Sequence, residues 1–204
     1  MTPPPATPGA DPRNRLLAIA GEHLRRSGKT RVRLVAVAEE AGMTHANVYR
    51  YFASREELLD AVAALALKPV ERLLADLSGA PDPADDKLER MIFALARGYR
   101  DLLDRDREAF MLFADAVREN RAVARRHLGR VRRAFTEAFE DGISEELFAV
   151  SDREAGLAFL VDALHRFIHP VSVAQDADRP RSVIDGRLKS VAAVVMRALR
   201  GGLV

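Results

Sequence analysis

The 204-residue sequence contains no cysteine and no tryptophan, and only 6% of its residues are aromatic. The absence of cysteine excludes disulfide bridges, cysteine-ligated zinc, iron–sulfur clusters and a cysteine nucleophile. No unbroken apolar run approaches the roughly 20 residues that a membrane helix needs, and no basic start leads into an apolar leader. We therefore expect a protein of the reducing cytoplasm that makes no use of a membrane.

Enzyme signatures are also missing from the sequence. It contains no G-x-S-x-G, G-x-G-x-x-G or H-E-x-x-H pattern, which excludes the usual hydrolase, dinucleotide and zinc-protease motifs. His165 and His169 are spaced to share one helical face and could begin a metal site, but no clear third and fourth ligands accompany them. We expect no catalytic activity, no metal and no cofactor.

What the sequence does contain is a large apolar fraction and an uneven distribution of charge. Hydrophobic residues make up 48% of the chain, which is enough for a substantial buried core. The net charge is +2, but residues 1–55 hold nine basic and four acidic residues, a balance of +5 that leaves −3 for the remainder. A basic first quarter predicts that this end of the molecule meets a polyanion.

Apolar residues recur at helical spacing along most of the chain, and no alternating pattern predicts a strand. The sequence therefore predicts an all-α fold of about nine helices. Capping boxes at 54–57 and 151–154 predict two helix starts, and Pro69 predicts a kink. We expect a disordered proline-rich arm over residues 1–12, a linker over 78–86 and a loop over 170–180.

The segment from Arg33 to Phe52 carries the most specific pattern. Two short apolar stripes are separated by Gly42, and Thr44 is placed to cap the second helix, which predicts a helix-turn-helix. Around Val48 and Phe52, which we expect to be buried, this second helix offers hydrogen-bonding and aromatic groups that can reach base edges and phosphates.

The run VAEEAGMTHANVYRYFASREELL, residues 37–59, resembles the DNA-binding signature of the tetracycline-repressor (TetR) family of bacterial transcription regulators. The resemblance extends over residues 13–66, and beyond them the chain agrees in length and helicity. It implies a helix-turn-helix DNA-binding domain over residues 13–60 and a helical ligand-binding and dimerisation domain over residues 61–204. The family's DNA contacts then fall on Thr44, His45, Ala46, Asn47, Tyr49, Arg50, Tyr51 and Arg55.

Arg33 departs from the family pattern, which commonly begins this helix with Ser or Thr, and we expect it to contact a phosphate instead. Together with the charge distribution, the resemblance predicts a homodimeric regulator, usually a repressor in this family, that binds a palindromic operator in double-stranded DNA and a small-molecule effector. The alternative is a helical module that binds a small molecule or a protein partner and has no DNA function.

Two further predictions concern the C-terminal domain. The helices at 151–168 and 182–199 carry more apolar positions than one inward face needs, which predicts that they form the dimer interface. Phenylalanine is concentrated between residues 93 and 159, and we expect most of these side chains to be core. The candidate walls of an apolar or aromatic effector site are Tyr99, Phe110, Phe113, Phe135, Phe139, Phe159 and His165.

Overall fold

The computed structural model describes residues 11–202, and within them the regular secondary structure is all helical, without a strand. The elements are α1 (Pro12–Ser27), the 3-10 helix η1 (Lys29–Arg31), α2 (Leu34–Glu40), α3 (His45–Val48), α4 (Arg55–Ser78), α5 (Ala84–Arg105), α6 (Arg107–Arg118), α7 (Ala122–Ser144), α8 (Arg153–Ile168), α9 (Pro170–Gln175) and α10 (Arg181–Arg200). The predicted all-α fold is confirmed.

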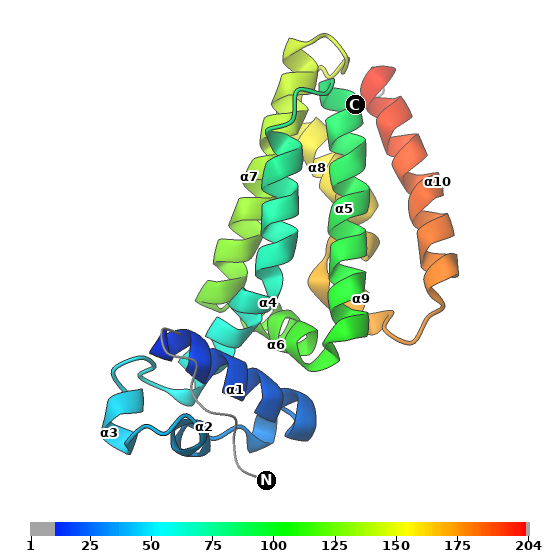
Figure 1. Ribbon diagram of the computed structural model, residues 1–204. Coiled ribbons are helices and arrows are strands. Elements are labelled where there is room, and N and C mark those ends of the chain that lie inside the picture. The colour runs from blue at the N-terminus through cyan, green and yellow to red at the C-terminus, as the bar shows by residue number, and fades with distance from the viewer. Residues whose placement is uncertain (1–10, 203–204) are drawn as a thin grey trace.

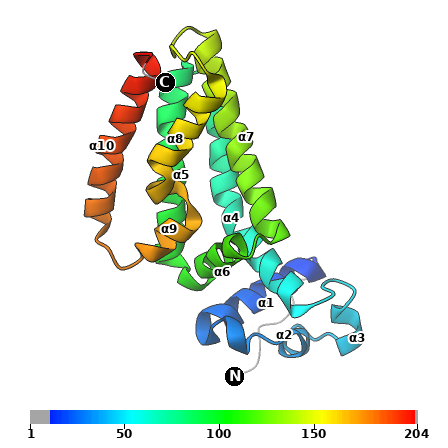
Figure 2. The ribbon, with the colours of Figure 1, turned by 180° about the vertical axis from the view of Figure 1, so that it is seen from behind.

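The helices form a small N-terminal unit below a tall bundle (Figure 1). Helices α1 to α3 make up the lower unit, and α4 leaves it to run upward beside α5 and α7. Seen from behind, α8 and α9 cover the other side of α5, and α10 stands at the far edge from α7 (Figure 2). Helix α6 lies across the base of the bundle, where it contacts α1, α4, α5, α7 and α9.

The start of α4 is fixed by the capping box that the sequence predicted. The Ser54 hydroxyl accepts a hydrogen bond from the Glu57 backbone N–H at 3.1 Å, while the Glu57 carboxylate accepts one from the Ala53 N–H at 2.7 Å. These bonds satisfy N–H groups that have no partner within the helix. Leu58, Leu59 and Val62 then enter the core, and the helix continues past Pro69 to Ser78.

Several predicted boundaries are corrected by the structure. Pro12 belongs to the first turn of α1, capped by the Asp11 carboxylate, because a helix tolerates proline at its first position; the rest of the predicted arm, residues 1–10, lies outside the described residues. The predicted linker shrinks to residues 79–83 between α4 and α5. The second capping box is replaced by Asp152, whose carboxylate accepts from the Glu154 and Ala155 N–H groups.

The loop predicted over 170–180 contains an unpredicted helix, α9. Pro170 ends α8 as expected, but it also occupies the first position of α9, where its missing N–H costs nothing. Val173 and Ala174 are buried on this short helix and belong to the core, where α9 packs against α6.

Candidate functional site

The turn between α2 and α3 is built around Gly42. Its φ of +68° lies in the left-handed region that glycine enters without steric cost. The Gly42 N–H donates to the Glu39 carbonyl at 3.0 Å and the Met43 N–H donates to the Ala38 carbonyl at 2.9 Å, so the end of α2 is closed. This turn sets the direction in which α3 leaves α2.

Helix α3 and the turn that follows it display most of the predicted DNA-contacting residues to solvent. Val48 and Phe52 are fully buried beneath them. Thr44 occupies the N-cap position but its hydroxyl makes no capping bond, which corrects the predicted cap and leaves the hydroxyl free. The helix ends at Val48, so Phe52 is not carried on it as predicted. The exposed residues are Thr44, His45, Ala46, Tyr49 and Arg50, while Asn47 is half-buried.

The remaining predicted contacts have structural partners of their own. Arg55 donates from Nε to the Val32 carbonyl at 2.7 Å and from Nη2 to the Lys29 carbonyl, so its guanidinium ties the start of α4 to the segment before α2. Tyr51 is half-buried and packs against the core. Arg33 is exposed at the N-cap of α2 and makes no capping bond.

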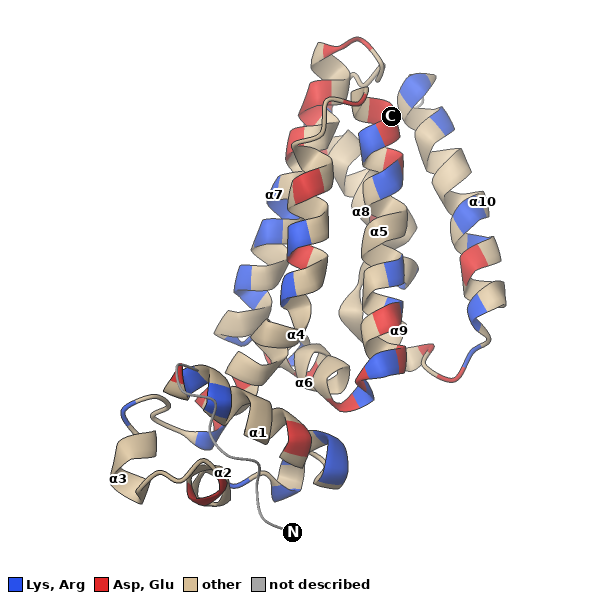
Figure 3. Cartoon of the chain, in the orientation of Figure 1, with Lys and Arg blue, Asp and Glu red and all other residues tan. Residues whose placement is uncertain are grey.

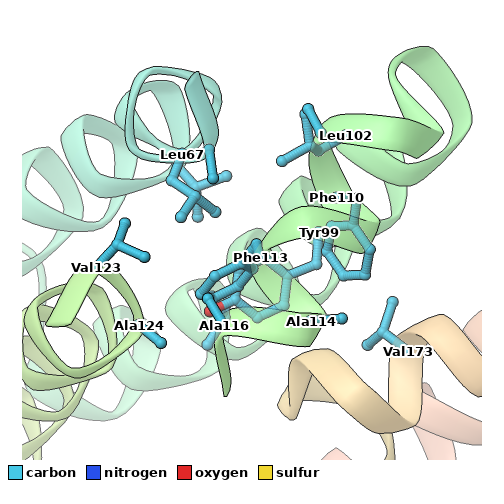
Figure 4. Close-up of a cluster of buried hydrophobic side chains, with 14 of the residues drawn as sticks. Leu67, Tyr99, Leu102, Phe110, Phe113, Ala114, Ala116, Val123, Ala124 and Val173 are labelled. Atoms are coloured by element: carbon cyan, nitrogen blue, oxygen red, sulfur yellow. The ribbon is translucent and has the colours of Figure 1, made fainter. Parts of the chain in front are cut away.

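The centre of the bundle holds a polar chain surrounded by aromatic rings. Tyr99 on α5 and His127 on α7 are joined by a 2.8 Å hydrogen bond, and Nδ1 of His127 lies 2.8 Å from Oε1 of Glu71 on α4. Glu71 also accepts from Arg130 at 3.0 Å. Tyr99 is 0% exposed, and its ring packs against Phe110 and Phe113 of α6 (Figure 4).

The pKa shifts of Glu71 and Tyr99 fix the direction of the hydrogen bonds among Tyr99, His127 and Glu71. Accepting the bond from His127 is the main cause that lowers the pKa of Glu71, so its carboxylate stays ionised and can only accept. We therefore assign the imidazole proton to Nδ1, which leaves Nε2 to accept from the Tyr99 hydroxyl. Burial strongly raises the pKa of Tyr99, so this phenol keeps its proton and remains a donor.

His127, Glu71 and Arg130 were not predicted as members of this site. A signal for His127 was present, since it falls on the apolar stripe of α7 between Ala124 and Val131, and a polar residue on such a stripe needs a buried partner. No comparable pattern marks Glu71, because its partner lies 56 positions away in the sequence.

The predicted effector residues do not line one cavity. Tyr99, Phe110 and Phe113 form the cluster around His127, whereas Phe139 packs on Phe148 with ring centroids 6.1 Å apart. Phe135 is buried in the core. Phe159 is half-buried on α8, and His165 is exposed there, stacked on His169 at 4.3 Å.

A groove of about 450 Å³ lies between α4 and α7, with Leu74, Val131 and Ala134 among its apolar lining. Glu71 and Arg130 also line it, so the polar chain runs from this groove to the buried Tyr99. The volume falls in the range of small-molecule sites. In the described structure the aromatic cluster beside the groove is itself tightly packed.

Helix α6 connects the aromatic cluster to the N-terminal unit. It carries Phe110 and Phe113 on its buried side, while its N-cap residue Asp106 accepts a 2.9 Å hydrogen bond from Arg25 of α1. Asp115 on the same helix pairs with Lys29. A displacement of α6 at the aromatic cluster would therefore change these contacts with α1 and η1.

Three of the six large hydrophobic residues that are exposed in the described part of the chain lie on α8 and α10. Val161 is 43% exposed on α8, and Val183 and Val194 are 48% and 59% exposed on α10. By length and composition alone, Arg153–Gln175 is apolar enough to cross a membrane, and 33% of its 18-residue apolar window is buried. In the structure this stretch is two helices, α8 and α9, divided at the His169–Pro170 step.

The two units define the class of protein: an N-terminal helix-turn-helix with its polar second helix exposed, joined to a helical C-terminal domain. Residues 16–62 match the family model for bacterial regulatory proteins of the tetR family, and residues 84–185 match that for the tetracyclin repressor-like C-terminal domain. The chain belongs to the TetR family, so it is a helix-turn-helix DNA-binding transcription regulator.

Solved structures of other proteins share the fold. A regulator of the TetR/AcrR family from Thermobifida fusca is 18% identical, covers 92% of this chain and 98% of its own, and has a TM-score of 0.66. RolR in complex with resorcinol is 21% identical, with coverage of 92% and 87% and a TM-score of 0.58. FadR from Bacillus subtilis in complex with stearoyl-CoA is 16% identical, with coverage of 93% and 98% and a TM-score of 0.62. The curated proteins gave no match.

Proposed function

We propose that the protein is a homodimeric repressor that binds a palindromic operator and leaves it when a small apolar or aromatic effector binds the C-terminal domain. The observation that carries the DNA-binding part is the exposure of Thr44, His45, Tyr49 and Arg50 around the buried Val48. A recognition helix of this kind presents its polar side chains to base edges in the major groove.

The charges of the N-terminal unit support this assignment. Of its arginines, Arg33 and Arg50 are exposed beside α2 and α3, where they can meet phosphates. In a dimer the two copies of α3 would enter successive major grooves about 34–36 Å apart, so the operator would be a palindrome.

Selection from a pool of random duplexes at low salt tests the DNA-binding part. We expect the wild type to enrich one palindromic sequence. His45→Ala and Asn47→Ala should relax base preference at defined positions, since each good base contact is worth about 1–3 kcal/mol of discrimination. Arg33→Ala is the matched comparison, because loss of a phosphate contact weakens all sequences alike. If no sequence is enriched, the protein binds a partner other than DNA.

The effector part rests on the cluster of Tyr99, Phe110 and Phe113 beside the groove between α4 and α7. The cluster itself is apolar and aromatic, as in small-molecule sites of helical bundles, whereas the groove combines apolar residues with the charged Glu71, Arg130 and Glu137. Two structurally similar proteins were solved with resorcinol and with stearoyl-CoA, and resorcinol and the stearoyl chain both present carbon-rich surfaces. Because the cluster is closed in the free protein, an effector entering it would move α6, and with it the contacts to Arg25 and Lys29.

Melting temperatures in the presence of resorcinol and of stearoyl-CoA test the effector class. An aromatic effector site predicts that resorcinol raises the melting temperature and that Phe113→Ala abolishes the shift. Phe139→Ala, in the separate pair with Phe148, is the control for general loss of packing. Equal shifts in both variants would place the ligand outside the cluster.

A further inference from the structure

The first half of α7 has the most one-sided charge of any described helix. Between Asn120 and Thr136 the chain carries six arginines and no aspartate or glutamate. The remainder of α7, by contrast, contains Glu137, Glu140 and Asp141. The positive charge is therefore confined to the half of α7 that lies nearer the N-terminal unit (Figure 3).

Four of these arginines surround an exposed glycine. Arg125 and Arg126 precede Gly129 by four and three residues, and Arg132 and Arg133 follow it by three and four. Residues at these spacings share one helical face, and the two pairs are separated along the axis by about 10 Å. A Cβ at Gly129 would meet no atom within 4 Å, so the surface between the pairs is open. We call Arg125, Arg126, Arg132 and Arg133 the arginine band.

The described residues form no salt bridge with the band, although Arg125 donates a hydrogen bond to the Asn120 carbonyl and Asp60 interacts electrostatically with Arg126. The neighbouring Arg121 pairs with Asp60, and Arg130 pairs with Glu71. Within residues 11–202, by contrast, no carboxylate lies within salt-bridge distance of any of the four band guanidiniums, and all four are exposed. Lys68 and Arg72, on the adjacent α4, are exposed as well. Like charges at these spacings repel one another, so a polyanion that binds here relieves an existing repulsion.

The position of the band favours DNA over an effector. It follows the outer edge of α7, on the same side of the molecule as α3 (Figure 3), and of its four members Arg133 also lines the groove between α4 and α7. The aromatic cluster lies on the opposite, buried face of α7, where His127 points inward. Arginine also suits phosphate oxygens, because its planar guanidinium donates two parallel hydrogen bonds.

We propose that the arginine band is a second nucleic-acid contact, which binds the phosphate backbone of double-stranded DNA without reading its sequence. The backbone can belong to the DNA that flanks the site held by α3, or to a second duplex. Both sources present the same chemistry, and the experiment below distinguishes them.

Gly129 offers a variant that should not disturb folding. Gly129→Glu places a carboxylate in the middle of the band, and Gly129→Gln places a neutral side chain of nearly the same size there. On a random-sequence duplex of about 60 base pairs, we expect Gly129→Glu to bind on the order of tenfold more weakly than Gly129→Gln, because it repels phosphates held by the band. On a duplex of about 20 base pairs, just long enough for two recognition helices, the two variants should bind equally if the band holds flanking DNA.

A charge-matched pair of variants provides the second measurement. The band variant replaces Arg125, Arg126, Arg132 and Arg133 by Gln, and the control variant replaces Arg90, Arg97, Arg105 and Arg107 by Gln. Each phosphate contact contributes about 0.9 to the slope of log K against log salt, so the band variant should lose about two or more from this slope on the long duplex. The control variant carries the same net charge and should keep the slope.

A capture experiment tests whether the band binds a second duplex. The protein is first saturated with an unlabelled, immobilised duplex, and the binding of a labelled short duplex is then measured. If the wild type captures the labelled duplex and the band variant does not, the band binds a second duplex. If capture is absent and the difference between Gly129→Glu and Gly129→Gln appears only on the long duplex, the band binds flanking DNA. Equal behaviour of the band and control variants in length dependence, salt slope and capture would overturn the proposal. The proposal would also be overturned if the band variant, but not the control variant, lost binding to polyglutamate while its DNA binding stayed unchanged, because the partner would then be an acidic protein. Operator selection on short duplexes is independent of this outcome.

Discussion

The Tyr99 hydroxyl on α5 donates a 2.8 Å hydrogen bond to Nε2 of His127 on α7, inside a cluster that is closed to solvent. Both residues are almost completely buried, so each depends on the other to satisfy its polar atoms. The bond therefore joins two helices of the C-terminal domain beside α6, which together with α4 contacts α1 of the N-terminal unit.

Tyr99→Phe should lower the free energy of unfolding by about 1–3 kcal/mol, because it leaves His127 Nε2 buried without a donor. His127→Leu should cost a similar amount for the complementary reason. The double variant should cost less than the sum of the two, with a coupling of about 0.5–3 kcal/mol measured by urea unfolding. Strict additivity would show that the bond does not contribute to stability.

Glu71 should make stability depend on pH. Its folded-state pKa is lowered from the ordinary 4.5, mainly by the hydrogen bond from His127, so the stabilisation is present above pH 4.5 and is lost as pH falls through the lowered value. Glu71→Gln should thus reduce the free energy of unfolding by about 1 kcal/mol at pH 7 and by much less at pH 3. Glu137→Gln on the same groove, where the carboxylate contacts the Ser78 hydroxyl at 3.4 Å, is the control for a general charge effect. A difference that persists unchanged at pH 3 would contradict this assignment.

Replacing Arg55 should lower the stability of the fold, in addition to any effect on DNA binding. Its guanidinium binds the carbonyl groups of Val32 and Lys29, which a lysine cannot reach with the same fork of donors. We expect Arg55→Ala and Arg55→Lys both to lower the melting temperature, with a loss of about 1.5–3 kcal/mol for the alanine variant. Arg50→Ala, at an exposed position, should leave the melting temperature nearly unchanged. If Arg55→Lys has the melting temperature of the wild type, the stabilisation comes from the positive charge and not from the two hydrogen bonds to carbonyl groups.

Features encoded by neighbouring residues could be predicted from the sequence. The Ser54–Glu57 capping box, the Gly42 turn and the exposed side of α3 each depend on residues within one or two turns of one another. The Asp106–Arg25 and His127–Glu71 contacts join residues 81 and 56 positions apart, and no local spacing signals them. For the same reason, the residues predicted to line one site are dispersed once the helices pack: Phe110 lies beside Tyr99, Phe139 packs on Phe148, and His165 is exposed on α8.

Gly42 and Gly129 should respond oppositely to alanine. Gly42 has a φ of +68° in the helix-turn-helix, so Gly42→Ala should cost about 1–2 kcal/mol although open space surrounds the site. Gly129 lies within α7 with similar open space and without a positive φ, so Gly129→Ala should stabilise the protein by about 0.5–1 kcal/mol. Thermal unfolding of both variants measures the contrast, and a destabilised Gly129→Ala would reveal a packing constraint on the outer face of α7.

The apolar face of α8 and α10 leads to a test of the dimer interface. Val195 on α10 is unsuitable for a charge, because it is 1% exposed and packs within its own subunit, so that Val195→Glu would unfold the chain. Val161 and Val194 are the better choice, because 43% and 59% of their surfaces are exposed in the single chain. Covering such a patch is what a dimer of this family's fold would do.

Val161→Glu combined with Val194→Glu should give a folded monomer by light scattering, since two like charges on each subunit would face each other across the two-fold axis. Helical content by circular dichroism should stay unchanged, which separates loss of the dimer from loss of the fold. Leu65→Glu is the matched control, because Leu65 is 42% exposed on α4, away from this face. A double variant that keeps the mass of the wild-type dimer would exclude the α8–α10 face as the interface. A monomer that has also lost operator affinity would show that binding depends on two recognition helices held at a fixed separation.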